Sequence, residues 1–299
     1  MYNILSFIIF LILYLISKIK IKSNLKKRQS FDIFKSNHEI FIDSHRGVNR
    51  EFFQNTYASF KRAIQYNIDG IELDVWLSAD NVPVVLHGGS DGEITGFYNG
   101  TGSVKNYTIE ELKQFRTIKD NQPMPLFEEV IKMCKNKIFI NIEIKDKRYD
   151  IVFNEVIKLL EKYDMLNQIQ ISSFHYGYYN KVKEYNMNNK KKIEFGFIYP
   201  PQTSKLFKYD YPNCTLNIYY TDVSEDVIKK AHDNNMAVLV WFGMHIKEDT
   251  KIYKKLFNIG VDGIITNESN LLKLFRDQYY SYKINYILNI YLLIYSLII

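Results

Sequence analysis

The 299-residue sequence predicts an α/β fold, the eight-stranded (β/α)8 or TIM barrel, with an antiparallel hairpin that extends its second strand. Three observations favour this fold. Short, nearly continuous apolar runs recur between helical patterns, which is typical of parallel strands covered on both faces. The strand–helix order repeats along the chain, which indicates a parallel sheet. No glycine-rich phosphate loop follows the first strand, which disfavours the alternative of an open doubly wound sheet.

Nine segments are expected to form strands, one more than the barrel needs. They are residues 40–44, 70–76, 82–87, 138–144, 168–173, 193–198, 215–220, 237–242 and 262–266. Only five residues separate the second segment from the third, whereas a parallel crossover needs about a dozen or more. These two strands should therefore pair as an antiparallel hairpin. If its turn centres near Asp80 and Asn81, paired positions sum to about 161 and His87 falls opposite Asp74.

Helices are expected to fill most of the gaps between strands. The segments are residues 56–66, 125–134, 151–163, 176–185, 225–234, 247–258 and 269–278. Local signals mark several helix starts. Asn55 stands in an N-cap position, Thr108 and Glu111 form a capping-box pattern, and Pro125 suits a first helical turn.

The charge distribution argues against nucleic acid as a partner. The net charge is +6, from 39 basic and 33 acidic residues, and residues 18–28 hold six of the basic residues and no acidic ones. Without that cluster the chain has 33 basic and 33 acidic residues, so its body is neutral. The two cysteines, Cys134 and Cys214, are too few for a disulfide framework or a thiolate zinc site.

The N-terminal segment predicts a membrane as a partner. Residues 4–17 are uncharged and apolar, and as a helix they would span about 21 Å, short of a hydrocarbon core of about 30 Å. The lysines that follow can close part of this gap by snorkelling. We interpret residues 1–28 as a membrane anchor with a basic flank, in preference to a signal peptide or a buried helix. The positive-inside rule then places the following domain on the cytoplasmic side.

The chain therefore divides into three parts: the anchor, a catalytic barrel over residues 38–278, and a hydrophobic tail over residues 279–299. Within the tail, residues 284–299 are uncharged. This stretch is interpreted as a second anchor, an interfacial helix or a helix that covers the barrel, and the sequence does not choose among the three.

Three carboxylates at expected strand ends predict a metal site. Glu72 and Asp74 are two residues apart on one strand, so their side chains share a face. Glu143 stands at the end of another strand. Carboxylates that point inward together repel each other unless a cation lies between them, and oxygen ligands suit Mg²⁺ or Ca²⁺. Lys145 shares the face of Glu143 and is a candidate ligand for an anion.

Two histidines are candidates for proton transfer near the same end of the barrel. His45 follows the first strand, and the adjacent Arg46 offers a guanidinium fork suited to phosphate. His87 ends the expected hairpin. A histidine pair beside a phosphate-binding arginine is what acid–base catalysis of P–O cleavage requires.

The chain resembles the glycerophosphodiester phosphodiesterase family over about residues 41–275. The matching segments occur in the family order: SHRG at 44–47, NT at 55–56, DGIELDV at 69–75, PVVLH at 83–87, PMPLFEEV at 123–130, IEIK at 142–145, SSF at 172–174, VWF at 240–242 and VDGIIT at 261–266. The resemblance implies a TIM barrel of the phospholipase C-like phosphodiesterase superfamily. It also implies a metal-dependent enzyme that hydrolyses glycerophosphodiesters to an alcohol and sn-glycerol 3-phosphate.

The resemblance assigns roles to eight residues. Acid–base catalysis falls to His45 and His87, metal binding to Glu72, Asp74 and Glu143, phosphate binding to Arg46 and Lys145, and a wall of the glycerol pocket to Trp241. Three positions depart from the family pattern: Gln54 and Asn267 replace acidic residues, and Gly88 stands where Asp is usual. Two alternatives remain. A membrane-anchored relative would act as a lysophospholipase D that releases lysophosphatidic acid, and a silent homologue would only bind lipid.

Overall fold

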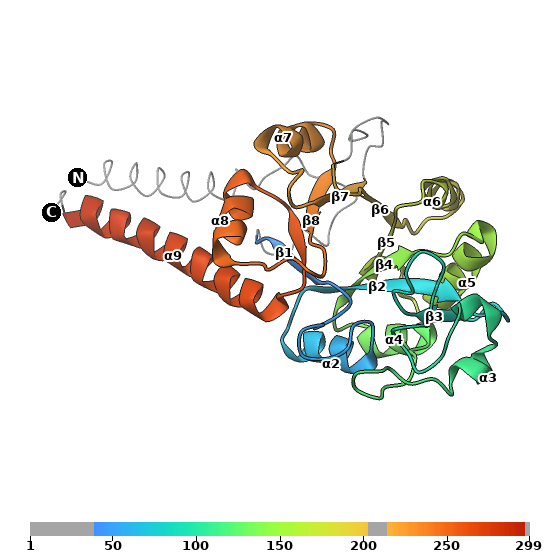
Figure 1. Ribbon diagram of the computed structural model, residues 1–299. Helices are drawn as coiled ribbons and strands as arrows, with labels where there is room; N and C mark the ends of the chain where they lie inside the picture. The colour runs from blue at the N-terminus through green and yellow to red at the C-terminus, as the bar shows by residue number, and fades with distance from the viewer. Residues whose placement is uncertain (1–38, 203–213, 297–299) are drawn as a thin grey trace.

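The computed structural model describes residues 39–202 and 214–296, and in this part of the chain the strands form one closed sheet, with the main hydrophobic core between the sheet and its helices (Figure 1). The order around the sheet is β1-β9-β8-β7-β6-β5-β4-β2, and β1 pairs with β2 to close it. All pairings in this ring are parallel, whereas β3 pairs antiparallel with β2. The predicted eight-stranded barrel with a hairpin on its second strand is therefore confirmed.

The strands lie within a residue or two of the predicted segments. Their bounds are β1 Phe41–Ser44, β2 Gly70–Leu77, β3 Pro83–Val85, β4 Phe139–Ile144, β5 Ile169–Ser173, β6 Glu194–Ile198, β7 Thr215–Tyr219, β8 Ala237–Trp241 and β9 Gly263–Thr266. Nearly all of their residues are buried, because the helices cover their outer faces and the opposite side of the barrel fills the interior.

The helices follow the predicted alternation. Their bounds are α2 Tyr57–Gln65, α3 Ile109–Leu112, α4 Phe127–Cys134, α5 Tyr149–Lys162, α6 Gly177–Asn188, α7 Glu225–Asp233, α8 Thr250–Ile259 and α9 Ser269–Ser296, with 3₁₀ turns at Val104–Asn106 and Leu166–Gln168. The capping box of Thr108 and Glu111 is present at the start of α3. The other two predicted helix starts are wrong in detail.

Thr56, not Asn55, is the N-cap of α2. Thr56 has the extended backbone that an N-cap needs, and its side chain accepts a hydrogen bond from the backbone of Ser59. Asn55 has a positive φ of 55° and therefore lacks the extended backbone of an N-cap residue. Pro125 likewise precedes α4 by two residues, and Leu126 occupies the N-cap position.

The hairpin forms with a register one residue away from the prediction. Val75 pairs with Val85 and Leu77 with Pro83, so paired positions sum to 160. The backbone N–H of Leu86, not that of His87, donates to the carbonyl of Asp74 over 3.1 Å. β3 ends at Val85, and the backbone then turns through Gly88 and Gly89, both at positive φ. His87 reaches the barrel mouth from this turn and not from a paired strand position.

The chain between β3 and α4 builds a small second core beside the barrel. Its buried members come from the hairpin and from the loop that follows: Trp76, Val84, Leu86, Ile94, Tyr98, Val104, Leu112 and Met124. This cluster fixes the loop that carries His87, because the indole Nε1 of Trp76 donates to the carbonyl of His87 over 3.1 Å.

Helix α9 continues well past the predicted end at residue 278 and projects from the barrel (Figure 1). Its first half is tied to the barrel wall. The Arg276 guanidinium donates to the carbonyl of Ile40 over 3.0 Å, and Ile40 N–H donates to the Tyr280 hydroxyl over 3.2 Å. Within residues 39–202 and 214–296, none of the helices is both long enough and apolar enough to cross a membrane. The predicted anchor at residues 1–28 lies outside the described residues.

Candidate active site

The three predicted metal ligands meet at the carboxyl ends of β2 and β4. The parallel register sets Asp74 beside Glu143, and alternation along β2 brings Glu72 to the same face. One carboxylate oxygen from each residue lies within 4.8 Å of the other two, and all three side chains are buried. Such close burial of three acids is costly without a cation among them.

The unpartnered oxygens of this triad fit a divalent cation. Glu72 Oε1 is buried and accepts no hydrogen bond from the residues that the structure describes. Asp74 Oδ1 has only the Lys145 ammonium, 3.4 Å away. Burial, and then the charges of Asp74 and Glu143, raise the pKa of Glu72 well above its usual range. A hard cation that prefers oxygen ligands would satisfy these atoms and favour the ionised form.

Arg46 and Lys145 supply positive charge on either side of the triad. Arg46 Nε lies 3.2 Å from Asp74 Oδ2, and Lys145 Nζ lies 3.0 Å from Glu143 Oε1. Burial alone would raise the pKa of Asp74, but Lys145 and Arg46 outweigh it and hold that pKa below its usual range. Lys145 also lines the pocket beside the carboxylates, where an anionic ligand could bind.

Asn55 belongs to the site, which the sequence analysis did not predict. Its Nδ2 donates to Asp74 Oδ2 over 2.7 Å, and the backbone N–H of Asp74 donates back to Asn55 Oδ1 over 3.3 Å. The reciprocal pair fixes the Asp74 carboxylate in one orientation. The only sequence signal was the segment NT at 55–56, which we interpreted as a helix cap.

A tight turn positions the loop that carries His45 and Arg46. Arg46 has a positive φ of 57°, and its backbone N–H donates to Glu72 Oε2 over 2.9 Å. Gly47 follows at φ 76°, where a Cβ would lie 2.4 Å from Ser59 Oγ. Only glycine lets this turn press against the start of α2. The guanidinium of Arg46 also donates to Gln54, so this departure from the family pattern still contacts the site.

The hydrogen bonds of His45 define its tautomer. Its Nδ1 lies 2.8 Å from Oδ1 of Asn267. That oxygen also accepts from Asn49, and Nδ2 of Asn267 donates to the carbonyl of Gly243, which fixes the orientation of the amide. The His45 proton must therefore be on Nδ1, which leaves a lone pair on Nε2, 3.9 Å from Glu72 Oε2. Burial, and then the Arg46 charge, lower the pKa of His45 to about 3.

His87 lies at the same mouth in a looser setting. Its ring is half-buried against Phe97, with centroids 6.0 Å apart, and makes no hydrogen bond to another residue of the described chain. Burial lowers the pKa of His87 to about 4, although the Asp74 carboxylate opposes this shift.

The adjacent Gly88 departs from the family pattern for a steric reason. Its φ is 62°, and a Cβ there would lie 2.7 Å from Gly92 Cα.

Trp241 stands at the end of β8 as part of an aromatic wall. Its ring makes edge contacts with Tyr219 and Phe174, at centroid distances of 4.8 and 6.1 Å. Its Nε1 donates to the carbonyl of Tyr199 over 3.2 Å, so the indole presents carbon atoms, not its N–H, to the mouth. The structure thus places all eight predicted residues around one end of the barrel.

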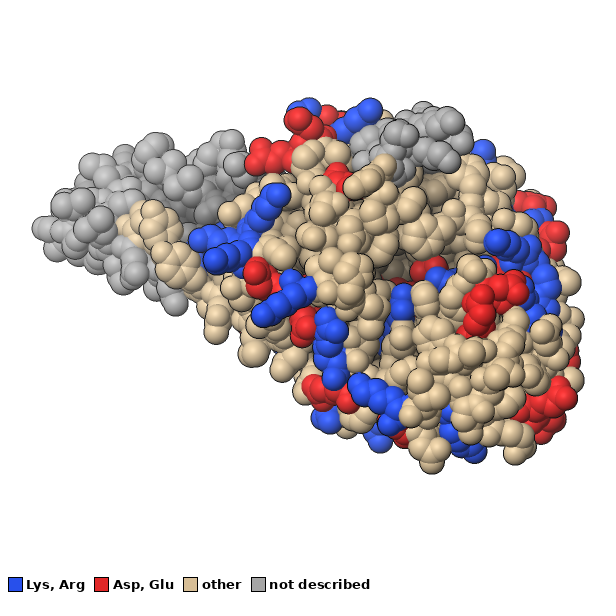
Figure 2. All heavy atoms as spheres, viewed as in Figure 1, with Lys and Arg blue, Asp and Glu red and all other residues tan. Residues whose placement is uncertain are grey.

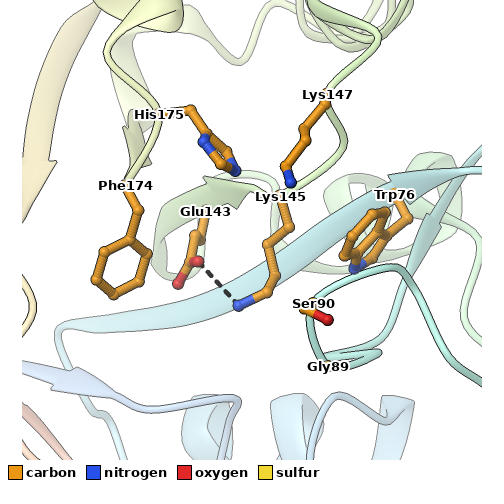
Figure 3. A pocket seen from close by; sticks show the side chains of 8 residues that line it. All are labelled: Trp76, Gly89, Ser90, Glu143, Lys145, Lys147, Phe174 and His175. Carbon is orange, nitrogen blue, oxygen red and sulfur yellow. Dashed lines mark hydrogen bonds and ion pairs between the residues drawn. The ribbon is translucent and has the colours of Figure 1, made fainter.

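A pocket of about 180 Å³ opens beside the triad (Figure 3). Its lining includes two members of the site, Glu143 and Lys145, and further residues from the hairpin and the loops after β4 and β5: Trp76, Gly89, Ser90, Lys147, Phe174 and His175. Figure 2 shows the hollow from outside, with both acidic and basic side chains at its floor. The mouth is therefore open to a charged ligand.

Comparison with known proteins relates this chain to one family. The model of the glycerophosphoryl diester phosphodiesterase family matches residues 45–271. The glycerophosphodiester phosphodiesterase of Caldanaerobacter subterraneus is 30% identical over 249 residues, which cover 77% of this chain and 95% of that protein. A protein of the same description from Bacillus altitudinis is 28% identical over 239 residues, covering 76% and 94% respectively.

Solved structures show the same barrel. A phosphodiesterase of Oleispira antarctica, solved in complex with the product sn-glycerol-3-phosphate, superposes with a TM-score of 0.69 at 22% identity and covers 80% of this chain and 97% of its own. The glycerophosphodiester phosphodiesterase of Thermotoga maritima has a TM-score of 0.62 at 23% identity, with 81% and 100% covered. The fold of this chain is thus shared with these proteins.

Proposed function

The chain belongs to the glycerophosphoryl diester phosphodiesterase family and is a phosphoric diester hydrolase, and from that premise we propose that it cleaves glycerophosphodiesters to an alcohol and sn-glycerol 3-phosphate. One observation carries the proposal: three buried carboxylates, the basic side chains of Arg46 and Lys145, and two histidines lie together at one barrel mouth. The product named in the Oleispira antarctica structure supports the same reaction.

Glu72, Asp74 and Glu143 would hold one divalent cation, Mg²⁺ or Ca²⁺. When bound, that ion supplies positive charge to offset the charge that builds on the phosphoryl oxygens. Arg46 and Lys145 would bind those oxygens from either side and orient the diester. Asn55 keeps Asp74 in the orientation that both the cation and Arg46 require.

The two histidines divide the proton transfers. His45 has its lone pair on Nε2, because Nδ1–H is held by Asn267, and it would accept the proton of the attacking hydroxyl or water. His87 would donate a proton to the oxygen of the departing alcohol as the P–O bond breaks. The anionic diester would stabilise the protonated form of His87, which burial disfavours.

The test is a product assay on a small panel of diesters with added Mg²⁺, Ca²⁺ or Mn²⁺. Glycerophosphocholine should give choline and glycerol phosphate, and EDTA should abolish turnover. Release of lysophosphatidic acid from lysophosphatidylcholine would favour the lysophospholipase D alternative. Diester binding by calorimetry without any phosphomonoester product would leave the protein as a silent lipid-binding homologue and contradict the proposal.

We also propose that the chain works at a membrane, with residues 1–28 as the anchor, residues 38–278 as the catalytic domain and residues 279–299 as the tail. The support is the uncharged run at residues 4–17 and the basic cluster at residues 18–28. The basic flank favours a cytoplasmic barrel. The full chain should sediment with membranes and resist extraction with high salt, whereas residues 38–278, which lack both the anchor and the tail, should not sediment.

A further inference from the structure

The pocket beside the triad carries two groups, Lys147 and His175, that the proposed chemistry does not use. Lys145 and Lys147 follow β4, His175 follows β5, and all three side chains face the same space (Figure 3). Glu143 is the one acid among the residues that line it, and that carboxylate is paired with Lys145 and shared with the triad. The pocket therefore lacks a negative group of its own.

The acids nearest in sequence to Lys147 are bound to other cations. The carboxylate of Asp146 is paired with Arg148 at 2.6 Å, and that of Asp150 is paired with Lys181. Lys147 is exposed and has no ion-pair partner among the described residues. The carboxylate of Asp91, next in sequence to the lining residue Ser90, is paired with Lys105. The charge of Lys147 is thus available to a ligand.

The positive charges of these lysines also act on His175. It is half-buried, its ring contacts Tyr149 at a centroid distance of 6.2 Å, and burial, then Lys147 and Lys145, lower its pKa. As a neutral ring, it offers a hydrogen bond, and a bound anion would favour the protonated form. A bound anion would therefore interact favourably with the two lysines and with His175.

The pocket's position gives it a place in the reaction. Lys145 contacts Asp74 and Glu143 and also lines the pocket, so the pocket adjoins the place where the proposed phosphodiester would bind. Phe174 lines this pocket, and its ring contacts that of Trp241, which we assign to glycerol. With glycerol against Trp241, the basic pocket is the neighbouring space open to the other substituent, the departing alcohol.

We propose that Lys147 and His175 form a specificity subsite that selects glycerophosphodiesters whose alcohol carries a negative charge, such as a carboxylate or a phosphomonoester. This inference rests on the proposed function. A quaternary ammonium alcohol fits the pocket poorly: Trp76 is its main aromatic surface besides Phe174, and the Lys105 ammonium already lies 5.6 Å from the Trp76 ring centroid. Cationic alcohols meet repulsion from both lysines as well.

The test compares kcat/KM for three diesters of glycerol 3-phosphate that differ in the charge of a similar-sized alcohol: hydroxypropanoate, propanediol and choline. The wild-type enzyme should prefer the anionic over the cationic alcohol by about tenfold or more, which corresponds to one favourable charge contact near a protein surface. The preference should shrink as ionic strength rises. Lys147→Met should lower the anionic-to-cationic ratio about fivefold, and Lys147→Met with His175→Gln should bring it close to one.

Lys158→Met is the matched control, because Lys158 lies on α5 outside the pocket and should leave the ratio unchanged. Circular dichroism and thermal unfolding show whether each variant is folded. Equal kcat/KM values for the three diesters, or a preference for choline that survives Lys147→Met, would overturn the subsite while the proposed function stands. Failure to cleave any of the three diesters would instead contradict the proposed function.

Discussion

Replacing Asn55 by glycine should weaken both the fold and the metal site. Asn55 makes two hydrogen bonds to Asp74, one to the ionised carboxylate at 2.7 Å and one from the backbone N–H at 3.3 Å. A bond to a charged group contributes about 1.5–3 kcal/mol and a neutral one about 0.5–1.5 kcal/mol. Asn55→Gly should therefore lower the free energy of unfolding by about 2–4 kcal/mol. Glycine is the right replacement, because it adopts the φ of 55° without strain.

The same change removes the group that orients a proposed metal ligand. Loss of such a partner weakens metal binding by about 10–100-fold. Urea denaturation measures the first effect, and titration of EDTA-treated protein with Mn²⁺ measures the second. The exposed Asn180 on α6 provides a control, because Asn180→Gly also removes an asparagine side chain but does not change the surroundings of Asp74. An Asn55→Gly protein with wild-type metal affinity would refute the role given to this residue.

Three further predictions follow from the geometry of the mouth. His45→Gln and His87→Gln should each lower kcat by about 10²–10⁴-fold with little change in unfolding midpoint, and a folded variant with full turnover would remove that histidine from the scheme. Gly47→Ala should cost about 2–4 kcal/mol of stability, because its Cβ would lie 2.4 Å from Ser59 Oγ at a φ of 76°, and urea denaturation checks this. The lowered pKa values of His45, about 3, and His87, about 4, mean that both rings fold neutral. The stability that these neutral rings contribute is present above the ordinary histidine pKa of about 6.5 and is lost as the pH falls toward 4, whereas the raised pKa of Glu72 acts in the opposite direction. The comparison with His87→Gln isolates the ring: in urea denaturation of the metal-free proteins, the wild type should be destabilised relative to His87→Gln as the pH falls from about 6.5 to 4, and a difference that does not change with pH would contradict this.

The barrel was predictable because its strands are short, nearly continuous apolar runs, which are typical of parallel strands covered on both faces. The hairpin was predictable for a second physical reason, since the five residues between β2 and β3 cannot make a parallel crossover. Its register was not, because the turn residues alone do not fix which pair closes the ladder. The observed pairing of Val75 with Val85 shifts every partner by one position from the prediction.

The site was predictable as a set of residues but not as a network. The spacing of Glu72 and Asp74 predicts that their side chains share a face. In contrast, no sequence pattern indicates that Asn55 forms hydrogen bonds with Asp74 instead of capping a helix. That contact depends on a positive φ at Asn55, which sequence patterns do not specify. The continuation of α9 to Ser296 was not predicted either, because the expected helix ended at residue 278 and residues 284–299 were interpreted as a separate segment.

The measurement that tests the account most directly is the anomalous scattering of Mn²⁺ in crystals of the protein. The buried, unpartnered carboxylate oxygens of Glu72 and Asp74, together with Glu143, predict one strong peak among the three side chains. The peak should vanish in crystals of Glu72→Gln grown under the same conditions. Saturating Mn²⁺ with no peak at the triad, or a peak that persists in Glu72→Gln, would contradict the proposal that this mouth is a metal-dependent phosphodiesterase site.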